Sequence, residues 1–464
     1  MRDRETIAAV SLSIAVLAFN FILGARLPIV WIDEVMYTDP AVNLALGRGL
    51  VSTAWYAQPS TDFWAGYPPL YAFLLAGWLK VFGVGCVSAR SMNFVLLAGV
   101  GLMLWWAVRQ QDLITTPLYR LAFLSLISLG MGMSWAFRTG RPDMLAAGLT
   151  VLVFLVASRP AGRKQGAALV VLGALLPFCQ LQLGLYAAVT SGLLTAVWRA
   201  KYIRTIFLLG IGVALGLFAL LGMYHQLGVL EGFWKSIIVH TSASGAHTGF
   251  SLMAGLSAIV LDLAVIPLSA VAAIVGFRVA RDGSEYRREW IFGVLLLLLL
   301  PFTFRTVGKY HIAYSWMVWI PLSFLTCRWV SLGLAPSGVK HKLCTILLFV
   351  AMAGFPLRSV AAVREWRTRD YRRIEVFVNE NVRPDDVIFS DDYAYYAVMK
   401  KAKRGFFAGH RPDPNEAAVV TAYLLQEHLR PAFERVLGGQ WERVASFSGM
   451  SNSIPTLTLY RRKN

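Results

Sequence analysis

Charged residues are scarce in this sequence of 464 residues, where they make up 15% of the chain against 57% hydrophobic residues. A soluble domain usually carries about 25% charged residues. This shortage excludes an ordinary soluble globular protein and favours a polytopic membrane protein, because apolar runs long enough to cross a bilayer recur along the chain. In a soluble protein, a formal charge of +18 would suggest binding to nucleic acid. In a membrane protein, the positions of the basic residues predict topology instead. No nucleic-acid partner is expected.

Cysteine is also scarce and widely spaced. The spacing excludes a disulfide framework and a CxxC metal site and argues against redox chemistry; the four residues are Cys86, Cys179, Cys327 and Cys344. The sequence has no P-loop, no dinucleotide fingerprint, no internal repeat and no Gly/Ser linker. Nothing in it predicts a nucleotide site.

About eleven membrane-spanning helices are predicted from the apolar runs. The run at 6–24 has no cleavage signature and is interpreted as a retained first span. The run at 165–198 is too long for one helix across a core of about 30 Å, so we expect two short spans that turn near Pro177 and Gln180. The other predicted spans are 91–108, 119–137, 143–158, 205–224, 253–276, 290–304, 311–327 and 343–357.

Basic residues in the loops predict the orientation. Beyond residue 100, fifteen Lys and Arg residues lie in one set of alternate loops and five in the other set. Because basic loops stay inside, the first set and the N-terminus are placed in the cytoplasm. This holds only if 67–83 lies along the outer interface rather than crossing. We therefore predict a multi-pass protein of the plasma (inner) membrane with outer loops at 25–90, 138–143, 225–252 and 305–311.

The last part of the chain, 358–464, loses the membrane pattern and is predicted to be a small extracytoplasmic α/β domain beside the membrane domain of 1–357. Helical runs are expected near 392–401 and 415–437, and strands at 386–390, 441–448 and 456–460. Tyr393, Tyr395 and Tyr396 are interpreted as core and surface of the first helix of this domain, with an acceptor groove as the alternative.

The outer loops hold the chemically capable residues. The carboxylates Asp33 and Glu34 directly follow the first span, and a carboxylate fixed at the interface can act as a general base on a hydroxyl. Arg138, Arg141 and Asp143 form the pattern R-T-G-R-P-D at a helix start, which suits a phosphate. Solvated loop acids and interfacial arginine anchors explain these patterns about as well.

A third pattern, G-K-Y-H at 308–311, places Lys309 and His311 on an apolar outer hairpin. Two cations there would suit a phosphate leaving group. A lysine that extends to the interface explains Lys309 almost as well.

Taken in order, these segments resemble integral-membrane glycosyltransferases of the C superfamily, in particular the bacterial branch related to protein O-mannosyltransferases and the lipid A aminoarabinose transferase. The resemblance covers most of 1–330 and is much weaker beyond. It rests on W-I-D-E at 31–34, Y-P-P-L-Y and W-L-K-V-F-G within 67–83, S-A-R-S-M-N around Arg90, R-P-D at 141–143, and G-K-Y-H.

The resemblance implies an active site on the outer face that takes its sugar from a polyprenyl-phosphate carrier. It assigns Asp33 as the essential carboxylate with Glu34 beside it, and Asp143 as a second acid. Lys309 and His311 would bind the donor phosphate, together with Arg138 and Arg141. Contacts to the acceptor or between loops are expected from Arg90, Tyr67, His240 and His247.

No metal or other cofactor is predicted. Some aminoarabinose transferases place Glu-Lys before the proline of the interfacial helix and use that Glu with a loop His to bind metal. This chain has Gly66 and Tyr67 at those positions, although His240 lies at a plausible loop position. The acceptor is expected to be lipopolysaccharide, another envelope glycan or protein. The sugar is expected to be transferred to it by a single displacement that inverts the anomeric configuration. A lipid or glycolipid transporter is the main alternative, and a non-catalytic membrane scaffold is a third.

Overall fold

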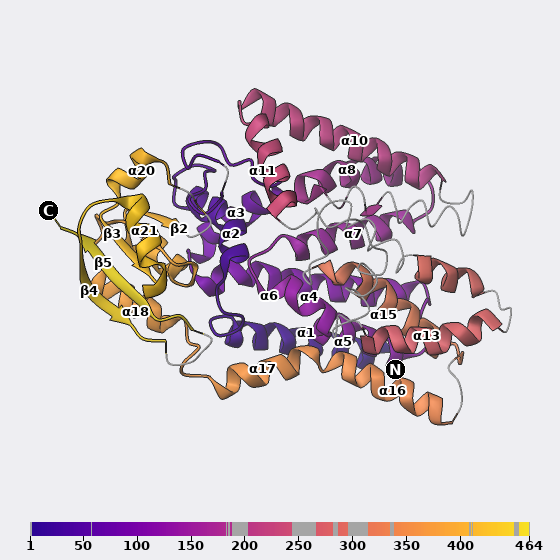
Figure 1. Cartoon of the computed structure of the whole chain (residues 1–464). Helices are drawn as coiled ribbons and strands as arrows, with labels where there is room; N and C mark the ends of the chain where they lie inside the picture. The colour runs from indigo at the N-terminus through magenta and orange to yellow at the C-terminus, as the bar shows by residue number, and fades with distance from the viewer. Residues whose placement is uncertain are drawn as a thin grey trace.

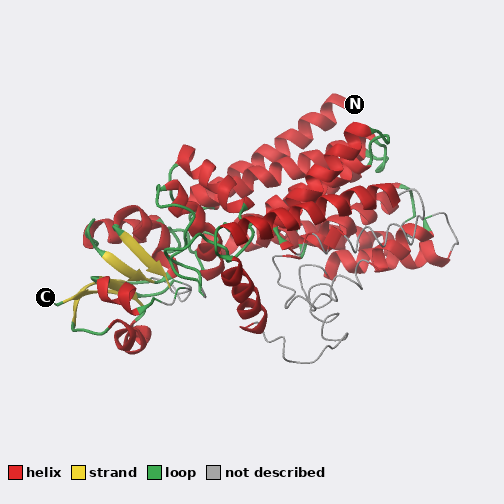
Figure 2. Cartoon of the chain, turned by 90° about the horizontal axis from the view of Figure 1, so that it is seen from above, coloured by secondary structure: helices red, strands yellow, loops and turns green. Residues whose placement is uncertain are grey.

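The computed structural model describes residues 2–56, 58–181, 183, 186–187, 203–243, 266–281, 286–295, 314–334, 338–407, 410, 412–449 and 454–463. Long helices form an extended bundle, and a small domain with all the strands lies at one end of it (Figures 1 and 2). The N-terminus lies at the far end of the bundle and the C-terminus in the small domain (Figure 1).

The membrane bundle is built from helices that match most of the predicted runs within the described residues. Their bounds are α1 Arg2–Leu23, α2 Ile32–Ala45, α3 Leu70–Phe82, α4 Cys86–Gln110, α5 Pro117–Leu129, α6 Ser134–Arg138, α7 Asp143–Ala157, α8 Arg163–Cys179, α10 Ile203–Gln226, α11 Leu230–Ala243, α13 Ile266–Arg281, α15 Trp316–Ser331, α16 Val339–Met352 and α17 Gly354–Arg364.

Three of these helices are long and apolar enough to cross a membrane: α1, α4 and α10. The count rises to five if α5 with α6, bent by 41°, and α16 with α17, bent by 50°, each form one broken span. The described residues thus support a multi-pass protein but do not confirm eleven spans. Most of the predicted spans at 253–276 and 290–304, and the second half of 165–198, lie outside the described residues.

The run at 67–83 forms the short apolar helix α3, which packs against α2. Both helices lie between the bundle and the small domain (Figure 1). The interfacial position of α3 stays a prediction.

Helix α1 is held to the bundle near its start by a buried ion pair. Nε of Arg120 lies 2.7 Å from Oε1 of Glu5, and its Nη2 donates to Oε2 of the same carboxylate at 2.8 Å. Trp105 on α4 donates its indole N–H to Glu5 as well. This cluster joins α1, α4 and α5.

The C-terminal domain has a five-stranded sheet in the order β2-β1-β3-β5-β4. Strands β2, β1 and β3 are parallel, whereas β5 pairs antiparallel with both β3 and β4. The strands are β1 Val387–Ser390, β2 Arg404–Phe407, β3 Ala422–Leu425, β4 Trp441–Phe447 and β5 Leu457–Arg462, and the helices are α18 Arg372–Asn381, α19 Tyr395–Lys401, α20 Pro414–Val419 and α21 Arg430–Leu437.

Strands β1, β4 and β5 confirm the predicted strands, but the prediction of one helical run at 415–437 is wrong. Strand β3 interrupts it between α20 and α21, and its four residues are all buried. Because Tyr423, Leu424 and Leu425 are apolar or aromatic and enclosed by strands on both sides, the central position in the sheet outweighs helix propensity. Strand β2 was not predicted.

Helices α8 and α10 approach each other at glycines. A Cβ at Gly216 would lie 2.2 Å from the carbonyl oxygen of Ala174, and one at Gly212 would lie 2.3 Å from that of Val170. Small residues allow this close backbone contact, which is a common basis of helix association in membranes.

We expect Gly216→Val to destabilise the bundle by about 1–3 kcal/mol, because its side chain would force the two backbones apart. Gly210→Val is the matched control, since Gly210 lies on the same helix with nothing within 4 Å of its Cβ position. Thermal unfolding of the detergent-solubilised variants measures the difference. Equal midpoints for both variants would contradict close packing at Gly216.

Candidate active site

The two carboxylates that follow the first span point in different directions. Asp33 and Glu34 lie in the first turn of α2, where negative charge is favoured by the helix dipole. Successive helical residues are about 100° apart around the axis. As a result the Asp33 side chain is 33% exposed, whereas the Glu34 side chain is fully buried.

Glu34 forms a two-pronged ion pair with Arg90 of α4. Nε and Nη2 of Arg90 each donate to one carboxylate oxygen at 2.6 Å, and both side chains are fully buried. The remaining Nη1 donates to the carbonyl oxygens of Gly24 at 2.7 Å and Pro28 at 2.9 Å. Arg90 therefore fixes the chain between α1 and α2. Because its side chain is fully buried, Arg90 has no exposed surface for an acceptor.

Asp33 is held by Arg141, the second arginine of R-T-G-R-P-D. Nη1 of Arg141 lies 2.5 Å from Oδ2 of Asp33, and Nε lies 2.9 Å from Oδ2 of Asp143. Asp143 is fully buried at the start of α7 and also accepts a hydrogen bond from Gln180 at 3.3 Å. One buried guanidinium thus joins two of the predicted acids.

The structure separates Arg138 from Arg141. Arg138 donates to the carbonyl oxygen of Leu27 at 2.7 Å, and its guanidinium lies 4.4 Å from the centroid of the Phe355 ring on α17. The segment between the arginines packs closely against α2, because a Cβ at Gly140 would lie 2.3 Å from Cγ2 of Thr38. Arg138 makes no ion pair among the described residues and its Nε has no hydrogen-bond partner there.

Aromatic side chains surround this centre. The Arg141 guanidinium lies 4.9 Å from the ring of Tyr37, and the Tyr37 ring packs edge-on against Tyr67 at 5.0 Å. The carbonyl oxygen of Tyr67 accepts a hydrogen bond from Tyr224 of α10. Burial and the negative charge of Asp33 raise the pKa of Tyr56 to about 12, so that this phenol stays protonated beside the carboxylate.

Other predicted residues cannot be placed at the centre. Lys309, His311 and His247 lie outside the described residues, and His240 lies on α11 with its side chain outside them. No group of three or more His, Cys, Asp or Glu in the described part of the chain is arranged to hold a metal ion.

Residues of the C-terminal domain reach the first outer loop, which the sequence did not indicate. Tyr395 and Tyr396 are fully buried and donate hydrogen bonds to Asp39 and Glu34 of α2. Their interpretation as ordinary core was incomplete, because only the folded chain shows that their hydroxyls meet carboxylates. The acidic residues of α2, with Asp39 five residues after Glu34, were the feature of the sequence that could have indicated partners for these hydroxyls.

A second contact joins the domain to this loop through His410. Its Nε2 lies 2.7 Å from Glu416 of α20, and its Nδ1 lies 3.2 Å from the carbonyl oxygen of Trp55. Ser60 of the outer loop donates a hydrogen bond to Glu416 and accepts one from Arg404 at 2.5 Å. Although burial raises the pKa of Glu416, the bonds from Ser60 and His410 outweigh it and leave the pKa below its ordinary value of 4.5.

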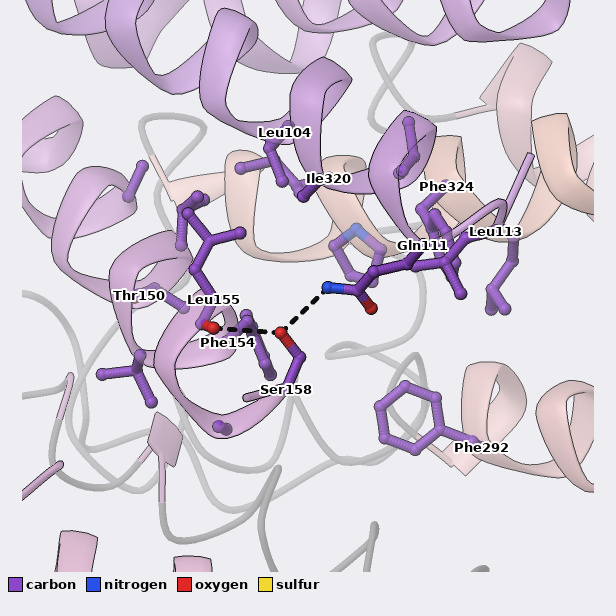
Figure 3. A pocket seen from close by; sticks show the side chains of 18 of the residues that line it. Leu104, Gln111, Leu113, Thr150, Phe154, Leu155, Ser158, Phe292, Ile320 and Phe324 are labelled. Carbon is purple, nitrogen blue, oxygen red and sulfur yellow. Dashed lines mark hydrogen bonds between the residues drawn. The ribbon is translucent and has the colours of Figure 1, made fainter. Parts of the chain in front are cut away.

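A cavity of about 470 Å³ lies elsewhere in the bundle, between the C-terminal halves of α4 and α7, the length of α15 and the start of α10 (Figure 3). Its lining is mostly apolar, with Gln111 hydrogen-bonded to Ser158 at one side. None of the predicted site residues that the structure describes lines this cavity, since Arg90 and its partners lie at the opposite end of α4.

The fold of this chain has a counterpart among solved structures. It is similar over 97% of both chains to the crystal structure of ArnT from Cupriavidus metallidurans bound to undecaprenyl phosphate, with 12% sequence identity and a TM-score of 0.59. An oligosaccharyltransferase from Archaeoglobus fulgidus tethered with an acceptor peptide is similar over 96% of this chain and 75% of its own, with 10% identity and a TM-score of 0.47. No family model and no curated protein matches the sequence.

Removal of one partner of the Glu34 and Arg90 pair is expected to destabilise the protein by about 3–5 kcal/mol, because it leaves a buried charge without its counterion. Arg90→Met should therefore give little folded protein, and Arg90→Met combined with Glu34→Leu should recover part of the loss. Folded yield after size-exclusion chromatography measures both. A single variant as stable as the wild type would contradict the pairing.

The lowered pKa of Glu416 predicts pH-dependent stability. A carboxyl with a depressed folded-state pKa contributes stability above its ordinary pKa and loses it as the pH falls through the folded value. The wild type should therefore unfold at a higher temperature than Glu416→Gln at pH 7, and this difference should shrink below pH 4.5. Glu442→Gln, on the exposed side of β4, serves as the control and should show no such trend.

Proposed function

We propose that the chain is a glycosyltransferase that moves a sugar from a polyprenyl-phosphate carrier to an envelope acceptor on the extracytoplasmic face of the plasma (inner) membrane. The fold shared with ArnT, whose structure holds undecaprenyl phosphate, supports this class of donor. The observation that carries the proposal is the partly exposed carboxylate of Asp33, which is oriented by the buried Arg141.

Asp33 is the proposed general base. Oδ2 is the oxygen that Arg141 contacts, which leaves Oδ1 to accept the proton of an acceptor hydroxyl. The acceptor oxygen forms a bond to the anomeric carbon as the bond from that carbon to the phosphate oxygen breaks. The proton passes to Asp33, the electron pair leaves with polyprenyl phosphate, and a single displacement inverts the anomeric configuration.

Positive charge must stabilise the departing phosphate. Arg141 already binds two carboxylates, which offset its positive charge. Its main proposed role is therefore to orient Asp33, and attraction of phosphate is its secondary role. Arg138, whose described contacts include no carboxylate, is the better candidate phosphate ligand, together with Lys309 and His311 of the outer hairpin. Asp143 is assigned to hold Arg141, and Glu34 to hold the turn that carries Asp33.

The proposed acceptor is lipopolysaccharide or another envelope glycan, with protein as the remaining option. No metal is assigned to the reaction, because Gly66 and Tyr67 replace the Glu-Lys pair that the resemblance associates with metal. Transfer that survives EDTA would agree with this assignment, and transfer that EDTA abolishes and Mg²⁺ or Mn²⁺ restores would overturn it.

Asp33→Asn is expected to reduce sugar transfer by about 10²–10⁴-fold, because a general base supplies a factor of that size. The assay follows radiolabelled sugar from polyprenyl-phosphate donors into total envelope material in membranes that contain each variant. Asp62→Asn is the matched control, since Asp62 is an exposed carboxylate of the same outer loop.

Label that depends on Asp33 but not on Asp62 would support the proposal, and the extraction behaviour of the product would identify the acceptor class. Near-wild-type transfer by Asp33→Asn would refute the assignment of the base. No transfer from any donor by well-folded wild type would favour a lipid transporter, which lipid-translocation assays would then test.

A further inference from the structure

Two adjacent tyrosines of the C-terminal domain reach across to the helix that carries the proposed base. Tyr395 and Tyr396 begin α19, more than 350 residues beyond α2 in the chain, and both side chains are fully buried. Each hydroxyl donates to a carboxylate of α2. The helix that carries Asp33 is thus held partly by another domain.

Tyr396 contacts the first turn of α2. Its hydroxyl donates to Oε1 of Glu34 at 3.2 Å and lies 3.3 Å from Oγ1 of Thr38. It also lies 3.6 Å from the Cβ position of Gly140, next to Arg141. The hydroxyl therefore lies where the first turn of α2 meets the turn that supplies the partner of Asp33.

Tyr395 contacts the next turn of α2. Its hydroxyl donates to Oδ1 of Asp39 at 2.9 Å, while Oδ2 of Asp39 accepts hydrogen bonds from Ser52 at 2.8 Å and from the Thr53 amide at 2.6 Å. Asp39 is buried, and burial raises its pKa although these hydrogen bonds oppose the rise. The three donors hold the second turn of α2 against both the outer loop and the C-terminal domain.

Backbone contacts continue the same interface. The Phe407 amide of β2 donates to the carbonyl oxygen of Thr53 at 3.1 Å, and Arg48 donates to the carbonyl oxygen of Lys403 at 3.1 Å. These bonds are specific and directional, which distinguishes the interface from loose contact between two domains.

We propose that Tyr396 and Tyr395 are positioning residues, through which the C-terminal domain fixes the orientation of α2 and so of Asp33. Tyr396 acts through Glu34, and Tyr395 acts through Asp39. The expected effect of these tyrosines on sugar transfer rests on the proposed function, whereas their positioning of α2 does not.

The chain offers a matched control in Tyr393, two residues before Tyr395. It is also buried in the C-terminal domain, but its hydroxyl has no hydrogen-bond partner among the described residues. Tyr393→Phe therefore removes the same atom from the same segment without touching α2.

The first measurement is amide hydrogen exchange over residues 32–45 of the full-length protein in nanodiscs. Tyr396→Phe should accelerate exchange in the first turn of α2 and Tyr395→Phe in the turn around Asp39, each by about tenfold, while Tyr393→Phe leaves α2 unchanged. If the tyrosine variants exchange like Tyr393→Phe, the proposal is overturned. This readout needs no substrate.

The second measurement separates positioning from general stability. Tyr396→Phe should lower kcat for sugar transfer by about tenfold, because a small displacement of the base is costly. KM for the donor, and the affinity for undecaprenyl phosphate, should stay within twofold of wild type. A loss of affinity that equals the loss in kcat would overturn the positioning role. If the two tyrosine variants accelerate exchange but the wild-type protein transfers no sugar from any donor, the proposed function alone is refuted and the positioning stands.

Discussion

The buried ion pair of Glu34 and Arg90 is the interaction on which the arrangement around the start of α2 depends. It joins the start of α2 to α4 and, through Nη1 of Arg90, satisfies two carbonyl groups where the chain leaves α1. A buried pair tolerates no loss of one member. Because it fixes the rotation of the first turn of α2, the side chain of the preceding residue, Asp33, lies about 100° around the helix axis and stays partly exposed.

Sequence patterns singled out the residues around the first turn of α2 but could not distinguish their surroundings. Asp33 and Glu34 look equivalent in W-I-D-E, and only the helical rotation separates the accessible acid from the buried one. Arg138 and Arg141 look equivalent in R-T-G-R-P-D, yet Arg138 contacts the carbonyl oxygen of Leu27 and Arg141 contacts Asp33. Periodicity predicts that an element exists, whereas the direction of each side chain depends on packing.

The C-terminal domain shows where local patterns are weakest. The sequence predicted β1, β4 and β5, whereas β2 and β3, four residues long like β1, are stabilised as strands mainly by their neighbours in the sheet. The contacts of Tyr395 and Tyr396 with α2 lie beyond any local pattern, since the partners are 356 and 362 residues apart. Such pairs cannot be predicted from the spacing of residues in one sequence.

That separation along the chain affects how the protein is made. Ribosomes complete α2 early and the tyrosines of α19 near the end, so the helix that carries Asp33 is made long before the residues that contact it. Closing so long a loop costs little more entropy than closing one of half the length. A nascent chain, or one truncated before residue 395, therefore carries every membrane helix that the structure describes but an unfinished outer loop.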